Sequence, residues 1–335
     1  MRAAVITRPG GPEVLEIRER LIPSPNAGEI LVRVHASALN RADLLQRQGQ
    51  YPAPPGAPPD IPGMEFAGEV VALGEGVSQW SEGDRVFGIV GGGGNAEYLV
   101  TDARTVTRIP SRLSWTEAAA IPEAFITAHD AMVMQAGVVA GETVLIHAVG
   151  SGVGLAAVQI ARAWRATPFG TARTAEKIER ARALGLEDGV VVGDDMNVIV
   201  TAVEKWTSGK GINVTMDLVS GPYLAAGIRV AASRGRIMII GTVAGRAGEI
   251  PIGMVLGKRL TLRGTVLRAR SIEEKRAVTS AFARDVIPLI ESGALAPTID
   301  STFDLADIAQ SHERLAANGT FGKVVLSSST PPRSS

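Results

Sequence analysis

A glycine-rich turn between a strand pattern and a helix pattern constrains the fold of this chain more than any other feature. The segment TVLIHAVGSGVGLAAVQIARAW, residues 143–164, contains an apolar strand pattern, a turn with three glycines and an alanine-rich helix pattern. Small residues allow the backbone to approach a pyrophosphate, and the N-terminus of the following helix offers free N–H groups and partial positive charge. The segment therefore predicts a dinucleotide-binding loop. A glycine turn made only for tight packing of the strand and the helix is the alternative.

The dinucleotide fingerprint fits this turn imperfectly, in one of two registers. If Gly154 is the last glycine of G-x-G-x-x-G, the first two glycine positions hold Val149 and Ser151. A register that begins at Gly152 and ends at Ala157 satisfies G-x-G-x-x-A.

Alternating strand and helix patterns follow this turn as far as residue 265. Strands are expected at 143–148, 166–171, 189–192, 213–219, 236–241 and 260–265. Helices are expected at 153–164, 175–184, 197–207, 222–232 and 252–258. Such alternation predicts a mostly parallel sheet with helices on both faces, that is, a doubly wound α/β domain.

The remaining residues have a different organisation. Short β-branched strand patterns fill the first 110 residues, namely MRAAVIT, EILVRVHASAL, GEVVALG, DRVFGIV and AEYLVT. Residues 51–62, YPAPPGAPPDIP, contain six prolines and predict a surface loop, either a rigid connector or a wall of a binding cleft.

Helical patterns occupy Ser111–Met134, 272–292 and 305–318, and a last strand is GKVVLS. Ser114 and Glu117 fit a capping box, and Pro122 is expected to break or kink its helical stretch. The tail SSTPPRSS is expected to be disordered.

Composition excludes several classes of function. The chain has 0 cysteines, which excludes disulfides, thiolate catalysis, iron–sulfur clusters and cysteine-ligated zinc. Lys+Arg and Asp+Glu are both 34, so no global basic excess favours nucleic acid as a partner. The longest uncharged run, Thr143–Ala161, is interrupted by glycines and polar residues, so no membrane partner is expected. The N-terminus does not resemble a secretory signal, and a cytoplasmic location is expected.

The stretch after the second strand of the alternation indicates the coenzyme. An NAD site usually carries Asp or Glu there, to bind the ribose 2′-hydroxyl. In FGTARTAEK no acid precedes Glu176, whereas Thr171, Arg173, Thr174 and Lys177 offer hydroxyls and two positive charges. These groups suit a 2′-phosphate through charge-assisted hydrogen bonds and predict NADPH. A solvated first helical turn with ordinary surface charges is the alternative.

Several motifs in order give the chain, over residues 1–326, a family resemblance. They are ASALNRADLLQRQGQYPAPPG, IPGMEFAGEV, AAAIPEAFITAHDAM, LIHAVGSGVGLAAVQIAR and FGKVVL. The chain resembles the zinc-independent quinone oxidoreductases, the zeta-crystallin group of the medium-chain dehydrogenase/reductase superfamily. DLLQRQGQYP followed by AAAIPEAF is similar to the tumour-suppressor-inducible branch. The resemblance implies a GroES-like β-rich catalytic domain of residues 1–118 and 266–335, an inserted Rossmann NADP-binding domain of residues 119–265, and an active site in the cleft between them.

Zinc-dependent members of the superfamily place a cysteine where this chain has Asn40, and a His-Glu pair where it has Met64-Glu65. No metal is therefore expected, and Lewis-acid polarisation of an alcohol is not favoured. The histidines show no ligand spacing and are expected to be structural or surface residues: His35, His129, His147 and His312. Without a metal the chemistry needs a hydride donor and an easily reduced acceptor, such as a quinone or an α,β-unsaturated carbonyl.

The resemblance places Asn40, Asp43 and Tyr51 near the nicotinamide as candidate catalytic residues. Tyr51 would hydrogen-bond the acceptor carbonyl or stack on a ring; its alternative is packing under the prolines. Asn40 and Asp43 have helix capping as their alternative. The implied coenzyme contacts are Asn40, Thr127, Gly150, Ser151, Gly152, Val153, Ile240, Gly241, Val266, Leu267, Phe321, Gly322 and Lys323, besides Thr171, Arg173 and Lys177. Some relatives carry a tyrosine near Gly193 over the adenine; it is missing here, and Arg173 is expected to compensate by stacking or by contacting the phosphate.

These features predict an NADPH:quinone oxidoreductase that uses two-electron hydride transfer, although one-electron transfer is also open in the family. An NADPH-dependent enone or enoyl-thioester reductase and an NADPH-binding protein without turnover are the alternatives. RNA binding is not favoured by zero net charge. The resemblance also implies a homodimer that joins two sheets along LTLRGT, residues 260–265, because an exposed sheet edge is normally covered or paired.

Overall fold

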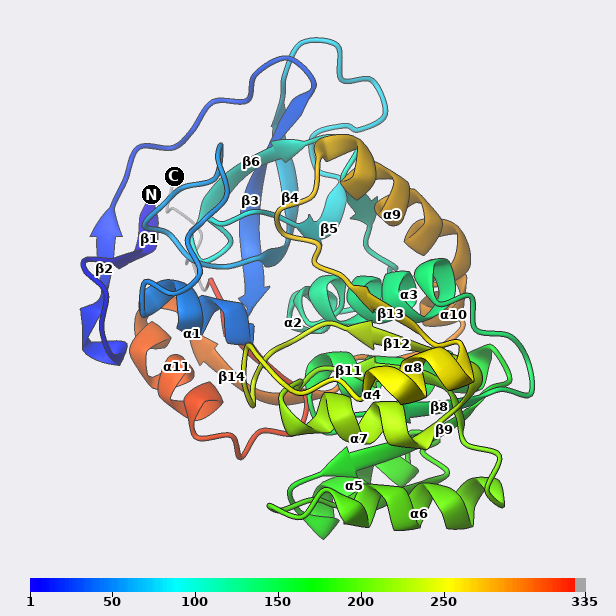
Figure 1. Cartoon of the computed structure of the whole chain (residues 1–335). Helices are drawn as coiled ribbons and strands as arrows, with labels where there is room; N and C mark the ends of the chain where they lie inside the picture. Colours follow the sequence, from blue (N-terminus) through cyan, green and yellow to red (C-terminus); the bar gives the residue numbers. More distant parts are fainter. Residues whose placement is uncertain (329–335) are drawn as a thin grey trace. The chain divides into compact units, whose positions relative to one another are not determined.

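The computed structural model describes residues 1–328, which divide into two compact units (Figure 1). Unit 1 contains Met1–Ile126 and the residues from Leu267 onward, and unit 2 contains Thr127–Val266. The domain limits expected from sequence, after residues 118 and 265, remain a proposal. The expected disordered tail lies outside the described residues from position 329 on. No helix of the described part is long and apolar enough to cross a membrane.

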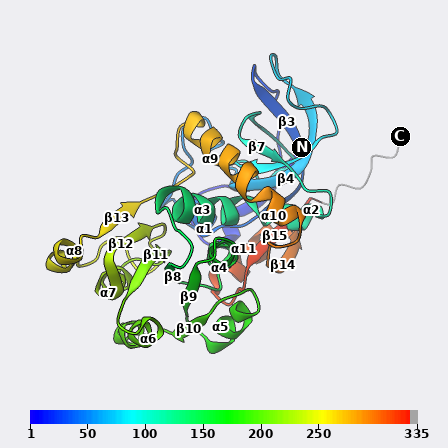
Figure 2. The same cartoon turned by 90° about the vertical axis from the view of Figure 1, so that its right-hand side faces the viewer.

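Unit 2 is built on a parallel six-stranded sheet in the order β10-β9-β8-β11-β12-β13 (Figure 2). Its strands are β8 Thr143–Ile146, β9 Thr167–Ala172, β10 Asp188–Val191, β11 Ile212–Asp217, β12 Ala231–Ile239 and β13 Thr261–Gly264. The alternation of patterns therefore predicted the sheet correctly. In the sheet, β9 and β10 lie on one side of β8, and β11, β12 and β13 lie on its other side. Ligands of open α/β sheets bind at such a switch point, outside the carboxyl ends of the strands.

Helices cover both faces of this sheet, with α4 beside α3 on one face and α6, α7 and α8 in a row on the other (Figure 2). Their bounds are α3 Thr127–His129, η3 Asp130–Gln135, α4 Gly152–Ala163, α5 Ala175–Arg182, α6 Asn197–Thr207, α7 Pro222–Val230 and α8 Ile252–Lys258. The expected doubly wound α/β architecture is confirmed for this unit.

Unit 1 is β-rich, as expected. Its main sheet has the order β14-β15-β3-β4-β5-β7, with β6 also paired to β3, and a separate hairpin joins β1 to β2. The strands are β1 Arg2–Ile6, β2 Leu15–Glu19, β3 Glu29–Ala38, β4 Glu65–Leu73, β5 Arg85–Ile89, β6 Tyr98–Asp102, β7 Val106–Arg108, β14 Ile299–Asp304 and β15 Lys323–Ser327.

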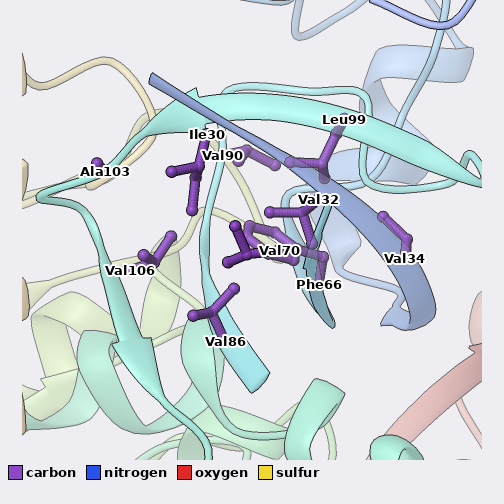
Figure 3. Close-up of a cluster of buried hydrophobic side chains, with 10 residues drawn as sticks. All are labelled: Ile30, Val32, Val34, Phe66, Val70, Val86, Val90, Leu99, Ala103 and Val106. Carbon is purple, nitrogen blue, oxygen red and sulfur yellow. The ribbon is translucent and has the colours of Figure 1, made fainter. Parts of the chain in front are cut away.

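The core of unit 1 lies on the long strand β3, whose residues alternate between buried and partly buried. Ile30, Val32 and Val34 point from β3 into an apolar cluster with Phe66 of β4 and Leu99 of β6 (Figure 3). Three strands were not predicted, namely β2, β7 and β14. β2 and β14 keep most of their residues at least partly exposed and carry acidic side chains, so they lack the apolar alternation on which the prediction depends.

Unit 1 has one long helix, α9, and several short ones. They are α1 Arg41–Arg47, α2 Trp115–Ala119, α9 Ile272–Asp285, α10 Ile287–Glu291 and α11 Ile308–Ala316, with 3₁₀ turns η1 Pro12–Val14 and η4 Leu305–Asp307 and the π-helical segment η2 Pro122–Ile126.

The capping box at Ser114 is confirmed, because the Ser114 side chain accepts the N–H of Glu117. Pro122 breaks the expected 111–134 helix, which ends at Ala119 and resumes as a π-helix. The prediction of one continuous helix over 272–292 was wrong. The helix is interrupted at Val286, two residues before Pro288, because proline is poorly tolerated inside a helix.

Candidate active site

The glycine-rich turn of unit 2 leads from β8 into α4. Ser151 is the N-cap residue of α4, and its Oγ accepts the N–H of Gly154 at 3.1 Å. A Cβ on Gly154 would lie 2.7 Å from the carbonyl oxygens of Ala148 and Val149, so only glycine fits there. Close packing of helix against strand is the role of the last glycine of the fingerprint. The structure therefore favours the register in which Gly154 is that glycine and Ser151 replaces the second one.

The residues expected at a 2′-phosphate lie where β9 leads into α5. Arg173 and Thr174 are exposed, and Thr174 caps α5. The side chain of Lys177 packs over Gly150 of the glycine-rich turn, since a Cβ there would meet Lys177 Cδ at 3.0 Å. One positive side chain, that of Lys177, thus lies against the turn. Thr171 is less suited to this role than the sequence indicates, because it is buried.

A buried polar cluster lies beneath the turn. Nδ1 of His147, just after β8, is 3.1 Å from Oγ1 of Thr171 on β9. Asp217, at the end of β11, accepts the backbone N–H groups of Val219 and Ser220 at 3.0 and 2.7 Å. His147 and Asp217 are both fully buried, and burial lowers the pKa of His147 although Asp217 opposes the shift. The cluster lies at the carboxyl ends of three neighbouring strands, and His147 is a buried rather than a surface residue.

The other residues of unit 2 that were predicted to contact the coenzyme differ in how far they are buried. Thr127 is buried, and among residues 1–328 its hydroxyl has no hydrogen-bond partner. Ile240 and Gly241 follow β12 and are half-buried; the Gly241 carbonyl accepts the hydroxyl of Ser220 at 2.7 Å. Val266 is exposed.

In unit 1 a buried lysine brings together three segments. Lys323 Nζ, at the start of β15, donates to the carbonyl oxygen of Leu39 at 2.9 Å, to Asn40 Oδ1 at 2.7 Å and to Glu65 Oε1 at 2.6 Å. Glu65 is fully buried on β4 and also accepts the side-chain N–H of Asn40 at 2.9 Å and the backbone N–H of Glu123 at 2.8 Å. Lys323 therefore forms a buried polar cluster with Asn40 and Glu65.

These residues do not fit a metal. The oxygens of Asn40 and Glu65 already bind the ammonium group of Lys323, which would repel a second cation. No group of three or more His, Asp or Glu side chains in the described part of the chain is arranged to hold a metal ion.

Asp43 has a capping geometry. Its Oδ2 accepts the backbone N–H of Asn40 at 2.7 Å, and its Oδ1 accepts that of Gly63 at 3.0 Å. Gly63 has φ +101°, and a Cβ there would lie 2.4 Å from the backbone nitrogen of Asn95. Burial raises the pKa of Asp43, partly offset by these two hydrogen bonds. Asp43 joins α1 to the next loop, which is the capping alternative, and it holds the backbone of Asn40.

Tyr51 lies in the proline-rich loop, half-buried against a guanidinium group. Arg268 Cζ lies 5.0 Å from the centroid of the Tyr51 ring. Arg268 is itself buried and donates to the carbonyl oxygens of Gly91 at 2.7 Å and Tyr51 at 3.3 Å and to Gln46 Oε1 at 2.5 Å. Burial raises the pKa of Tyr51 although Arg268 lowers it, so the phenol keeps its proton at neutral pH. The ring packs on a cation, rather than only under prolines.

Unit 1 contains three further residues that were predicted to contact the coenzyme. Leu267 and Phe321 are buried, and Gly322 directly precedes β15. Three charged residues of the site were not predicted to act in it: Glu65, Glu123 and Arg268. A signal existed for Glu65, because a charged residue in an apolar strand pattern such as GMEFAGEV must be paired when buried.

Comparison with known protein families gives a match in each of the two units. The family model of the alcohol dehydrogenase GroES-like domain matches residues 26–111, and that of the zinc-binding dehydrogenase matches residues 152–284. A quinone oxidoreductase of Lama guanicoe is 34% identical over 333 residues, which cover 97% of each chain.

Solved structures agree with these matches. A quinone oxidoreductase of Pseudomonas syringae pv. tomato has a TM-score of 0.87 at 28% identity, covering 98% of this chain and 99% of that one. A mycobacterial protein solved in complex with NADPH has a TM-score of 0.87 at 27% identity, covering 98% of this chain and 100% of that one. The chain belongs to the quinone oxidoreductase family of the medium-chain dehydrogenase/reductase superfamily, and it is an oxidoreductase of the nicotinamide-dependent type.

Proposed function

We propose that this protein is an NADPH-dependent quinone oxidoreductase that works without a metal. The observation that carries the proposal is the arrangement in unit 1, where a half-buried phenol packs on the buried Arg268. A flat, conjugated, uncharged acceptor can stack there and accept a hydrogen bond from Tyr51. The family relatives named quinone oxidoreductases support this acceptor class.

Unit 2 is proposed to hold the coenzyme. The residues present fit it: the N-terminus of α4 with its cap Ser151 suits the pyrophosphate, and the buried hydroxyl of Thr127, which has no partner among residues 1–328, would gain one from a ligand. Arg173 and Lys177 suit the 2′-phosphate of NADPH, and the NADPH-bound mycobacterial neighbour supports this choice. When bound, the coenzyme supplies a hydride.

Unit 1 is proposed to hold and polarise the acceptor. Tyr51 would donate a hydrogen bond to an acceptor oxygen, and Arg268 would fix the ring and add positive potential as charge grows on that oxygen. Asn40 is held by Asp43, Glu65 and Lys323, so its amide keeps one orientation.

An acceptor panel tests the proposed function. Wild-type protein is mixed with NADPH and with a para-quinone, an ortho-quinone or an enone, and the loss of NADPH absorbance is recorded. We expect faster loss with a quinone than with the enone. Faster loss with the enone would assign the protein to enone reduction, and NADPH binding without any turnover would assign it a binding role.

Replacing Tyr51 by Phe tests the acceptor contact. We expect kcat/KM for the quinone to fall about tenfold, because a hydrogen bond worth about 1.4 kcal/mol is lost. NADPH affinity should stay unchanged. Tyr98→Phe, which removes the hydroxyl of another partly buried tyrosine of unit 1, is the control. An unchanged kcat/KM in Tyr51→Phe would remove Tyr51 from the acceptor site.

The protein is also proposed to form a homodimer through unit 2. β13 pairs with β12 alone among the described strands, which leaves an open sheet edge. Beside it α8 exposes Ile252 and Leu256, four residues apart and therefore on one face. Large exposed apolar surfaces of this kind mark interaction sites.

Leu256→Glu is expected to convert the dimer to a monomer, because it places a charge in the apolar contact. Light scattering after size exclusion measures the mass of each variant. Leu21→Glu, which changes another exposed leucine in unit 1, is expected to leave the mass unchanged. A monomeric wild-type protein would contradict the proposed dimer.

A further inference from the structure

We propose that Glu123 is the residue that donates a proton to the acceptor as it is reduced. The inference rests on the proposed function and adds a residue to the same site. Glu123 lies in the π-helical segment η2, and its backbone N–H donates to Glu65 Oε2 at 2.8 Å. π-Helical turns occur frequently at functional sites.

The other ionisable groups of the cluster are already engaged. Both carboxylate oxygens of Glu65 and both of Asp43 accept hydrogen bonds. Lys323 Nζ uses its three N–H groups on three acceptors, and Arg268 donates to three oxygens. Each of these groups therefore already has its polar atoms bound to partners in the cluster.

Glu123 differs from them. Its Oε2 is buried and, among residues 1–328, has no hydrogen-bond partner, while the residue as a whole is only partly buried. An ionised carboxylate with a buried unpaired oxygen is costly, whereas a protonated one is not. The geometry therefore leaves Glu123 as the group of this cluster that can carry a proton and release it.

The electrostatics agree with this assignment. Burial raises the pKa of Glu123 to about 8; the negative charges of Glu65 and Asp43 also raise it, whereas Lys323 and Arg268 lower it. The carboxyl is therefore mostly protonated at neutral pH. Glu123 also belongs to the same cluster as the candidate catalytic residue Asn40, because Glu65 accepts both the backbone N–H of Glu123 and the side-chain N–H of Asn40. Burial raises the pKa of Tyr51, so its phenol is a weaker acid than a free tyrosine.

The proposed step balances. The O–H bond of the Glu123 carboxyl breaks and an O–H bond forms on the acceptor oxygen. The acceptor gains this proton and a hydride from NADPH, so it is reduced by two electrons while NADPH is oxidised to NADP⁺. The carboxylate left on Glu123 then takes a proton from water.

Glu123→Gln tests the proposal, because an amide keeps the shape of the side chain but cannot donate a carboxyl proton. The wild-type kcat for the quinone should be high below pH 8 and should fall as the pH rises through that value, because the carboxyl then loses its proton. In Glu123→Gln we expect kcat to fall roughly 100-fold at pH 7 and to lose this decline, since general acid catalysis contributes roughly 10²–10⁴-fold. Glu82→Gln, at an exposed glutamate of unit 1, should match the wild type.

A measurement that does not depend on turnover distinguishes the proposed role of Glu123 from the proposed quinone oxidoreductase function. Infrared difference spectra of wild-type protein, recorded from pH 6 to pH 10, should show a protonated carboxyl band that disappears near pH 8 and that is missing in Glu123→Gln. A wild-type protein that reduces no acceptor but shows this band would contradict the proposed function alone. Quinone turnover with the same pH profile in the wild type and in Glu123→Gln would overturn the role of Glu123. The role of Glu123 would also be overturned if Glu123→Gln lost activity but its kcat still declined as the pH rose through about 8.

Discussion

Replacing Lys323 with Met is expected to lower the free energy of unfolding by about 3–5 kcal/mol, because it leaves a buried carboxylate without its cation. Glu65 is fully buried, and the ammonium group of Lys323 lies 2.6 Å from its Oε1. Urea denaturation measures the change, followed by the fluorescence of Trp80 and Trp115, which both lie in unit 1. The same variant is expected to bind quinone more weakly, because Asn40 loses a partner.

A second substitution tests whether the unpaired charge of Glu65 causes the loss of stability in Lys323→Met. Glu65→Gln in the Lys323→Met background should recover part of the lost stability, since the remaining amide carries no charge. Lys210→Met, at an exposed lysine, should change stability by less than about 0.5 kcal/mol. A loss of stability in Lys323→Met no larger than that of Lys210→Met would show that the ammonium does not hold this cluster together.

Removing both Arg173 and Lys177 is expected to weaken NADPH binding about 100-fold and to change NADH binding little. Each charge-assisted hydrogen bond to a phosphate contributes about 1.5–3 kcal/mol, which corresponds to tenfold or more for each side chain. NADH lacks the 2′-phosphate and makes neither contact. Calorimetric titration of the Arg173→Ala/Lys177→Ala double variant with both coenzymes measures the two affinities.

The single variants and a matched control complete this test. Arg173→Ala and Lys177→Ala should each weaken NADPH more than NADH, while Arg180→Ala, at another exposed arginine of α5, should affect both coenzymes equally and slightly. An equal loss of NADPH and NADH in the double variant would refute the assignment of a 2′-phosphate site to this turn.

Unit 2 was predicted more completely from sequence than unit 1, for a physical reason. Each strand of a parallel sheet is buried on both faces and is followed by a helix, so apolar runs and turns mark the elements clearly. Unit 1 contains strands such as β14, Ile299–Asp304, whose residues are half exposed and whose partners are distant in sequence. Local pattern carries little information about such strands.

The site shows the same limit. Asn40 and Tyr51 were expected from motifs, and the capping role of Asp43 was open as an alternative. The pairing of Glu65 with Lys323 joins residues 258 positions apart, and Arg268 reaches the proline-rich loop from a position 217 residues beyond Tyr51. Neither contact could be predicted locally, because a local pattern can mark a charge such as Glu65 as needing a partner but cannot identify that partner.

The most direct test of the central proposal is NADPH oxidation by a para-quinone with protein that has been treated with a strong metal chelator and dialysed. The absorbance of NADPH is followed with and without the quinone, before and after treatment. We expect quinone-dependent oxidation at the same rate in both samples, because Lys323, Arg268 and Tyr51 take the place of a metal in the proposed site. No quinone-dependent oxidation in either sample, or a rate lost on chelation and restored by added zinc, would contradict it.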